Sequence, residues 1–368
     1  AHRVGAVDGV VAYVAKKAGL WPTWSSRELN LMTMHKNLRL FYLLVLVTAI
    51  AAGVRYLDHQ EAAELTRSAA AADFAVTDTA AVDKIFIADK DGNTALLERT
   101  SGRYWSLNGR HQARKDAVDL LLKTFLRARV QRPVPVAELD NVNRLLAGRG
   151  KKVEIYQGGD QPVKTWYIGT STQNHTGTYM VLADETGQLA EEPFVVHMEG
   201  FTGFLSTRFF TDEREWRYTG VFDYPGSSLK RVEIDRVEDG RSYAITVGER
   251  GELTVEGATL TSRRDTLAWQ NRFNLFRKVH LETYNNHLSE AAEDSIFQRA
   301  QPAFVLRAWS HTDTVPSEIK LYWKAPVSDT YDDYGNLNKW DGSRMYAIYR
   351  DELVLVQRFV FDPLLQGL

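Results

Sequence analysis

A run of fifteen uncharged and mostly apolar residues near the N-terminus constrains this chain more than any other feature. The run spans 40–54, lies between Arg39 and Arg55, and precedes more than 300 residues of mixed sequence. Apolar runs of this length occur both in signal peptides and in short signal anchors. His35, Lys36 and Arg39 precede the run, and short basic flanks tend to stay in the cytoplasm. The large C-terminal part is therefore expected to cross the membrane.

The resulting prediction is a single-pass protein of the cytoplasmic (inner) membrane with its large C-terminal part in the periplasm. The segment 49–51 (AIA) has the small-x-small pattern of a cleavage site, but no polar break separates it from the apolar run. We favour an uncleaved signal anchor at 34–57, while a cleaved signal peptide and a buried core helix stay open. Residues 1–33 are interpreted as an N-terminal tail or upstream read-through, and the Ala- and Glu-rich residues 58–75 as a stalk.

Composition narrows the class of protein. Hydrophobic residues make up 44% and charged residues 25% of the chain, which is ordinary for globular material of about two domains. The net charge is -2 and both signs are interleaved, so binding to nucleic acid is disfavoured. Because the sequence has no cysteine, disulfides, thiolate metal sites and thiol catalysis are excluded.

From Phe74 onward, short runs of β-branched and aromatic residues alternate with turn signals, which predicts strands. In the first half, strands are expected at 84–87, 94–97, 104–107, 153–156, 165–168, 178–182 and 194–198. A helix is expected at 115–129, and a short one at 136–147. The first helix has an apolar stripe at helical spacing, which we expect to be buried on a sheet. Its members are Val118, Leu121, Leu122, Phe125 and Leu126.

The second half resembles the first in the order of its motifs. The matched segments are 82–87 with 229–234, 102–109 with 251–257, 153–156 with 319–322, and 179–182 with 346–349. A helix at 269–284, with Trp269, Phe273, Phe276 and Val279 on one face, stands where the first half has its own helix. The predicted fold class is α+β: an N-terminal membrane anchor helix and two tandem, duplicated β-rich units, 76–224 and 225–368, each with a helix packed on a sheet. Chance similarity between two β-rich halves is the alternative.

Two acidic loops are candidate calcium sites. The segment 89–93 (DKDGN) has its glycine at the fourth position instead of the sixth, so a hairpin turn is favoured there. Asp329, Asp332, Asp333 and Asn336 form a denser oxygen cluster, which fits either a weak extracellular calcium site or a solvated loop. No histidine pair has metal spacing, and neither a nucleophile elbow nor a phosphate-binding loop occurs. We therefore predict no catalysis, no cofactor and no nucleotide.

Aromatic and arginine residues crowd the stretch 166–217. Both types are enriched at hot spots of protein interfaces, and sugar-binding surfaces also use exposed rings. The alternative is that these rings fill the space between sheet and helix. The candidate interface residues are Arg208, Phe209, Phe210, Trp216 and Arg217.

The order of features resembles a bacterial family classed as domain of unknown function 4340, common in Bacteroidetes. The resemblance covers about 34–365 and is carried by KIFIADKDGN at 84–93, KVEIY at 152–156, GTYMVL at 177–182 and, most specifically, by 192–217. The chain departs from the family pattern at Tyr218, where an acidic residue is expected. The resemblance implies an anchored extracytoplasmic protein with no assigned activity, and some members resemble auxiliary components of gliding-type ABC transporter systems.

Two functions follow as predictions. The first is a membrane-anchored accessory or scaffold protein of an envelope assembly, with the cytoplasmic membrane and other envelope proteins as partners, and without nucleic acid. The alternative is an extracytoplasmic module that binds a glycan or another ligand.

Overall fold

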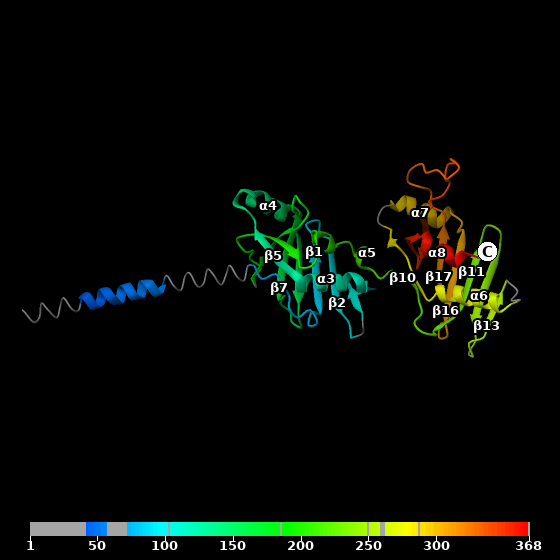
Figure 1. Cartoon of the computed structure of the whole chain (residues 1–368), viewed down its shortest axis with the longest axis horizontal. Coiled ribbons are helices and arrows are strands. Elements are labelled where there is room, and N and C mark those ends of the chain that lie inside the picture. Colours follow the sequence, from blue (N-terminus) through cyan, green and yellow to red (C-terminus); the bar gives the residue numbers. More distant parts are fainter. Residues whose placement is uncertain are drawn as a thin grey trace, which may run out of the picture. The chain divides into compact units, whose positions relative to one another are not determined.

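The computed structural model describes residues 42–56, 72–101, 104–184, 186–248, 250–257, 262–285 and 288–366. The chain divides into two compact units, 1–70 and 71–368. In the first unit, residues 42–56 form a helix (Figure 1). None of the helices in the described ranges is both long and apolar enough to span a bilayer. The membrane role of the predicted anchor thus stays a prediction.

The predicted tail 1–33 and most of the predicted stalk lie outside the described residues. The end of the stalk prediction is wrong. Phe74 is buried, because its ring packs edge-on against Trp166 with ring centroids 6.0 Å apart. The first core therefore begins before the predicted boundary at 76.

The first half of the second unit is built on a nine-stranded antiparallel sheet with the order β4-β3-β2-β1-β6-β7-β8-β9-β5. Its strands are β1 (Lys84–Ala88), β2 (Thr94–Arg99), β3 (Trp105–Leu107), β4 (His111–Gln112), β5 (Ala128–Pro133), β6 (Lys151–Tyr156), β7 (Lys164–Ser171), β8 (Thr178–Ala183) and β9 (Phe194–Met198). The seven strands predicted for this half are confirmed. β4 and β5 were not predicted: β4 has only two residues, the start of β5 falls within the helix predicted at 115–129, and Pro133 reads as a chain break.

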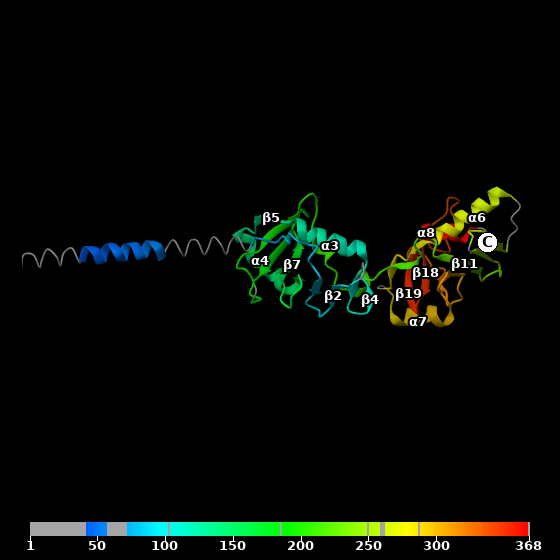
Figure 2. The same cartoon turned by 90° about the horizontal axis from the view of Figure 1, so that it is seen from below.

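Two helices cover opposite faces of this sheet (Figure 2). Successive residues of a strand point to opposite faces, and in β8 Met180 belongs to the main core whereas Val181 belongs to a smaller one. α3 (Lys115–Arg127) packs on the main core, and α4 (Val136–Arg149) covers the smaller core with Val142 and Leu146.

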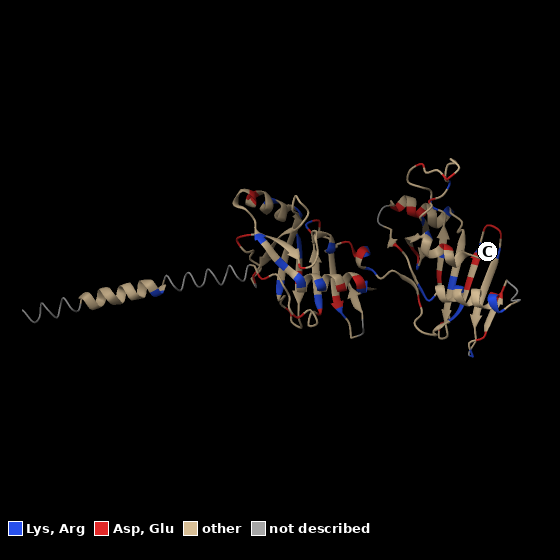
Figure 3. Ribbon diagram, viewed as in Figure 1, with Lys and Arg blue, Asp and Glu red and all other residues tan. Residues whose placement is uncertain are grey.

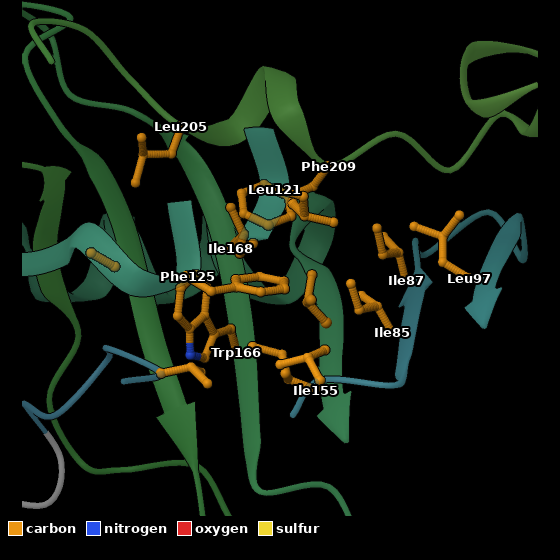
Figure 4. Close-up of a cluster of buried hydrophobic side chains, with 14 of the residues drawn as sticks. Ile85, Ile87, Leu97, Leu121, Phe125, Ile155, Trp166, Ile168, Leu205 and Phe209 are labelled. Carbon is orange, nitrogen blue, oxygen red and sulfur yellow. The ribbon is translucent and has the colours of Figure 1, made fainter. Parts of the chain in front are cut away.

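The buried face of α3 differs from the predicted stripe. Leu121 and Phe125 are fully buried, as expected, and Phe125 meets Trp166 edge-on at 5.1 Å (Figure 4). Leu122 is only partly buried and Leu126 is 39% exposed, so the prediction was wrong for these two residues. The buried face of α3 is therefore rotated relative to the predicted stripe: Ala117 and Thr124 are buried, in place of Leu122 and Leu126. The Thr124 hydroxyl is satisfied by donating to the Leu120 carbonyl oxygen at 2.7 Å.

The second half holds an eight-stranded antiparallel sheet with the order β13-β12-β11-β16-β17-β18-β19-β15. Its strands are β11 (Leu229–Arg236), β12 (Ser242–Val247), β13 (Leu253–Glu256), β15 (Thr283–Tyr284), β16 (Phe304–Ser310), β17 (Ser317–Tyr322), β18 (Arg344–Tyr349) and β19 (Glu352–Gln357). β10 (Gly220–Asp223) pairs separately with β14 (Lys278–His280). The helices are α6 (Arg263–Leu275), α7 (Glu290–Arg299) and α8 (Arg358–Leu365).

The two sheets share one strand order. The run β3-β2-β1-β6-β7-β8-β9 corresponds position by position to β13-β12-β11-β16-β17-β18-β19. Along the chain, α3 and α4 stand where α6 and α7 stand in the second half. One sequence match was wrong: 153–156 in β6 was matched with 319–322 in β17, but β16 holds the place of β6. Alternation of apolar and polar residues is common to all half-buried strands, so it does not identify a particular strand.

The bounds predicted for the helix at 269–284 are wrong, because the helix lies earlier in the chain, as α6 (Arg263–Leu275). α6 begins after Ser262, whose hydroxyl accepts a hydrogen bond from the Asp265 amide at 3.2 Å, and Val279 lies in β14. A serine followed three residues later by an acidic residue is a helix-start signal that outweighs the apolar spacing. The change between the two main cores falls between Trp216 and Val221, slightly before the predicted boundary at 224/225.

Candidate functional site

The predicted interface rings belong to the interior of the first half. Phe209 and Trp216 are fully buried in the main core, and Phe210 packs against it. The indole Nε1 of Trp216 donates to the Phe210 carbonyl oxygen at 2.9 Å. The alternative stated above, that these rings fill the space between sheet and helix, is confirmed for Phe209 and Trp216, and the prediction that they form an exposed interface is wrong.

The two predicted interface arginines are also held within the chain. Arg208 donates to the Thr124 hydroxyl at 2.7 Å and stacks over Phe201, and burial lowers the pKa of its guanidinium. Arg217 forms an ion pair of 2.6 Å with Glu352, and its guanidinium lies 3.8 Å from the ring centroid of Tyr284. Both side chains join parts of the fold.

The two candidate calcium loops are structural hairpin turns of the same kind. In 89–93 and 332–336, the first aspartate accepts hydrogen bonds from the amides two and four residues later at 2.8–3.0 Å. The glycine at the fourth position has φ near +85° in both, at +88° and +83°, a backbone conformation that glycine adopts freely. Hydrogen bonds from Asn336 lower the pKa of Asp332. The carboxylate oxygens thus hold the turns together.

Over the described ranges, no group of three or more His, Cys, Asp or Glu residues is placed to hold a metal ion. The second acidic loop is nevertheless part of the most distinctive surface feature. β17 and β18 are joined by 323–343, twenty-one residues, whereas the equivalent β7 and β8 are joined by the six residues 172–177. We name 323–343 the aromatic loop. It projects from the second half (Figure 1, orange), and loops of this length in compact domains are usually functional.

The base of the aromatic loop is pinned by a buried ion pair. Lys324 Nζ lies 2.8 Å from Asp341 Oδ2, and the two side chains are 7% and 16% exposed. The Asp341 carboxylate also accepts the amides of Ser343 and Arg344. Burial opposes ionisation of Asp341, but these hydrogen bonds and that from Lys324 hold its pKa below its ordinary value.

Two tryptophans strengthen the base. The rings of Trp323 and Trp340 are stacked, with centroids 5.9 Å apart and planes at 16°. Lys339 lies over Trp340 and Arg358 of α8 lies over Trp323, so each ring also has a cation beside it. The two ends of the aromatic loop are therefore fixed to each other and to the body of the second half.

The tip of the aromatic loop carries apolar and acidic side chains in solvent. The exposed apolar residues are Val327, Tyr331, Tyr334 and Leu337, and Tyr334 is 91% exposed. A bridge between Tyr331 and Leu337 and a 2.8 Å hydrogen bond from the Asn338 amide to the Thr330 carbonyl oxygen close the tip. Figure 3 shows red acidic positions on this loop. Exposed aromatic side chains on a pinned loop favour a binding surface.

The sequence held a signal for this surface. Tyr331, Tyr334 and Trp340 lie in a long stretch without strand or helix periodicity. The sequence-based prediction of a site in this stretch used only its acidic and amide residues. No model of a known protein family matches the chain, and no curated protein matches it. The resemblance to the domain of unknown function 4340 family therefore stays a prediction.

Proposed function

We propose that this chain is a membrane-anchored extracytoplasmic accessory or scaffold protein of an envelope assembly, and that the aromatic loop binds a partner protein. The observation that carries the proposal is the exposure of Tyr331, Tyr334 and Leu337 at the tip of a loop whose base is fixed. Ordering a loop in advance lowers the entropic cost of binding.

The composition of the aromatic loop supports a protein partner. Tyrosine, serine, glycine and asparagine dominate protein-recognition loops, because tyrosine supplies rigid contact area and the small polar residues supply adaptable hydrogen bonds. Between 323 and 343 the loop has two residues each of Tyr, Ser, Gly, Asn and Trp, together with four Asp. This composition matches a recognition surface.

The charged residues at the tip of the aromatic loop indicate which kind of partner surface would be complementary to it. Asp329, Asp332 and Asp333 lie next to the exposed tyrosines in the sequence, and Lys339 follows five residues after Tyr334. A partner surface with an apolar pocket and a basic rim is complementary to this tip. The same acidic residues disfavour insertion into an anionic membrane surface.

The proposal also includes the location of the chain in the membrane and the origin of its two halves by duplication. The apolar run with its basic flank supports a single-pass anchor in the cytoplasmic membrane with the two sheets in the periplasm. The shared strand order of the sheets supports a tandem duplication. The resemblance stated above supports a link with a gliding-type ABC transporter system, in a non-enzymatic role without a cofactor.

A glycan-binding module is the second candidate, favoured by the almost fully exposed ring of Tyr334. Such a ring can stack on a sugar face. A photo-crosslinking amino acid placed at Tyr334 in living cells separates the two. We expect a discrete crosslinked protein at this position, and none when the crosslinker replaces Val136, which is 85% exposed on α4. Crosslinking at neither position, together with Tyr334-dependent signals on a glycan array, would favour the glycan.

A further inference from the structure

The first half has an open pocket of about 380 Å³ that lies outside the proposed partner surface. It lies at the end of α4, the start of β6, the end of β7 and the 3-10 turn η1 (Ser206–Arg208). Its polar lining consists of Arg149, Lys151, Thr170, Ser171, Ser206 and Thr207. Two cations and four hydroxyl groups thus line one pocket, without a carboxylate.

Both cations have unused hydrogen-bonding capacity. Lys151 Nζ donates to the Phe209 carbonyl oxygen at 2.6 Å, which uses one of the three donors of an ammonium. Burial lowers the pKa of Lys151, and the charge of the Asp89 carboxylate opposes this shift. Arg149 is exposed, and in the part of the chain that the structure describes it makes no hydrogen bond or ion pair.

We propose that the Arg149–Lys151 pocket binds the oxyanion of a small ligand, a phosphate or a carboxylate group. The guanidinium of Arg149 and the ammonium of Lys151 provide charge-assisted hydrogen bonds, which are stronger than neutral ones. The hydroxyls of Ser206 and Thr207 provide further donors. Ser171 is already paired with Nδ1 of His175 at 3.2 Å and borders the pocket.

Titration calorimetry on the solubilised 368-residue protein tests this, with inorganic phosphate and succinate as separate probes at constant ionic strength. We expect saturable binding of at least one probe. The probe that binds tells a phosphate ligand from a carboxylate ligand. Arg149→Gln should weaken binding roughly tenfold, because it removes a charged hydrogen-bonding partner.

Arg144→Gln is the matched control, because Arg144 lies on the same helix but outside the pocket lining. It should leave the affinity unchanged. Lys151→Gln should weaken binding as Arg149→Gln does, with a thermal melt to verify folding. Absence of saturable binding for both probes, or equal weakening by Arg144→Gln and Arg149→Gln, would overturn the proposal.

Discussion

The two sheet-containing halves have the same strand order but differ in what joins their strands. In the first half, six residues join β7 to β8, and α4 is packed by Val142 and Leu146. In the second half, the aromatic loop joins the equivalent strands, and α7 has no fully buried residue in the described part of the chain. The sheets thus provide a common frame, and the connections distinguish the halves.

This difference has a physical basis. The order of the strands in each sheet is maintained by buried side chains, and a substitution among these side chains costs packing energy. A surface connection can lengthen at a small entropic cost, which grows only with the logarithm of its length. We therefore place recognition in the connections and stability in the two main cores. The predictions below test that division.

The largest effect is expected at Trp166, which is fully buried among Phe74, Phe125 and Phe209. Trp166→Ala should cost about 3–5 kcal/mol of unfolding free energy. Amide exchange during urea unfolding should show the loss in β7 and not in β16, if the two cores are independent. Equal destabilisation of both strands would show that the halves unfold as one unit.

Trp166→Phe provides the matched variant. The indole Nε1 of Trp166 is buried and has no hydrogen-bond partner in the described structure. Removing an unsatisfied donor offsets part of the lost packing. The phenylalanine variant should therefore be clearly more stable than the alanine variant.

The rotated face of α3 predicts unequal costs for neighbouring leucines. Leu121→Ala should cost about 2–5 kcal/mol, because its side chain is fully buried. Leu122→Ala should cost less, since this residue lies at the edge of the core, and Lys123→Ala should stay within about 0.5 kcal/mol. Denaturant melts measure all three. Equal losses at Leu121 and Leu122 would instead support the stripe expected from the sequence.

The base of the aromatic loop should be sensitive to loss of one charge. Asp341→Ala should cost about 3 kcal/mol, because it leaves the Lys324 ammonium buried without its partner. The double variant with Lys324→Met should recover much of the loss. Asp119→Ala, which breaks an exposed pair with Lys115, should cost less than about 1 kcal/mol. Similar losses at Asp341 and Asp119 would refute a pinned base.

The same ion pair gives a pH dependence with a defined sign. The pKa of Asp341 lies below its ordinary value in the folded protein. Its stabilising contribution is therefore complete above the unfolded pKa, about 4, and is lost as the pH falls through the folded pKa. Tryptophan fluorescence should report loosening of the Trp323–Trp340 stack upon acidification, and Asp341→Asn should remove this transition.

The sequence was sufficient for seven of the nine strands of the first sheet and for the correspondence of β1, β3 and β8 with β11, β13 and β18, because apolar alternation and turn residues are local signals. It was insufficient for the face of α3, since Ala117 and Thr124 are buried only through tertiary packing. The predicted interface failed for the same reason: rings such as Phe209 and Trp216 are enriched at interfaces and in cores alike. Burial separates these cases, and burial depends on which elements meet in space.

Quantitative affinity purification of the native protein from detergent-solubilised cells tests the central claim most directly. The double variant Tyr331→Ser/Tyr334→Ser should change stability by less than about 0.5 kcal/mol, because both side chains are exposed. It should lower the recovery of one specific envelope protein roughly tenfold or more, as expected when aromatic hot spots are removed. Val136→Ser, an exposed control on α4, should leave recovery unchanged. Equal recovery with the wild type and the tyrosine variant would contradict the assignment of the aromatic loop as the partner-binding surface.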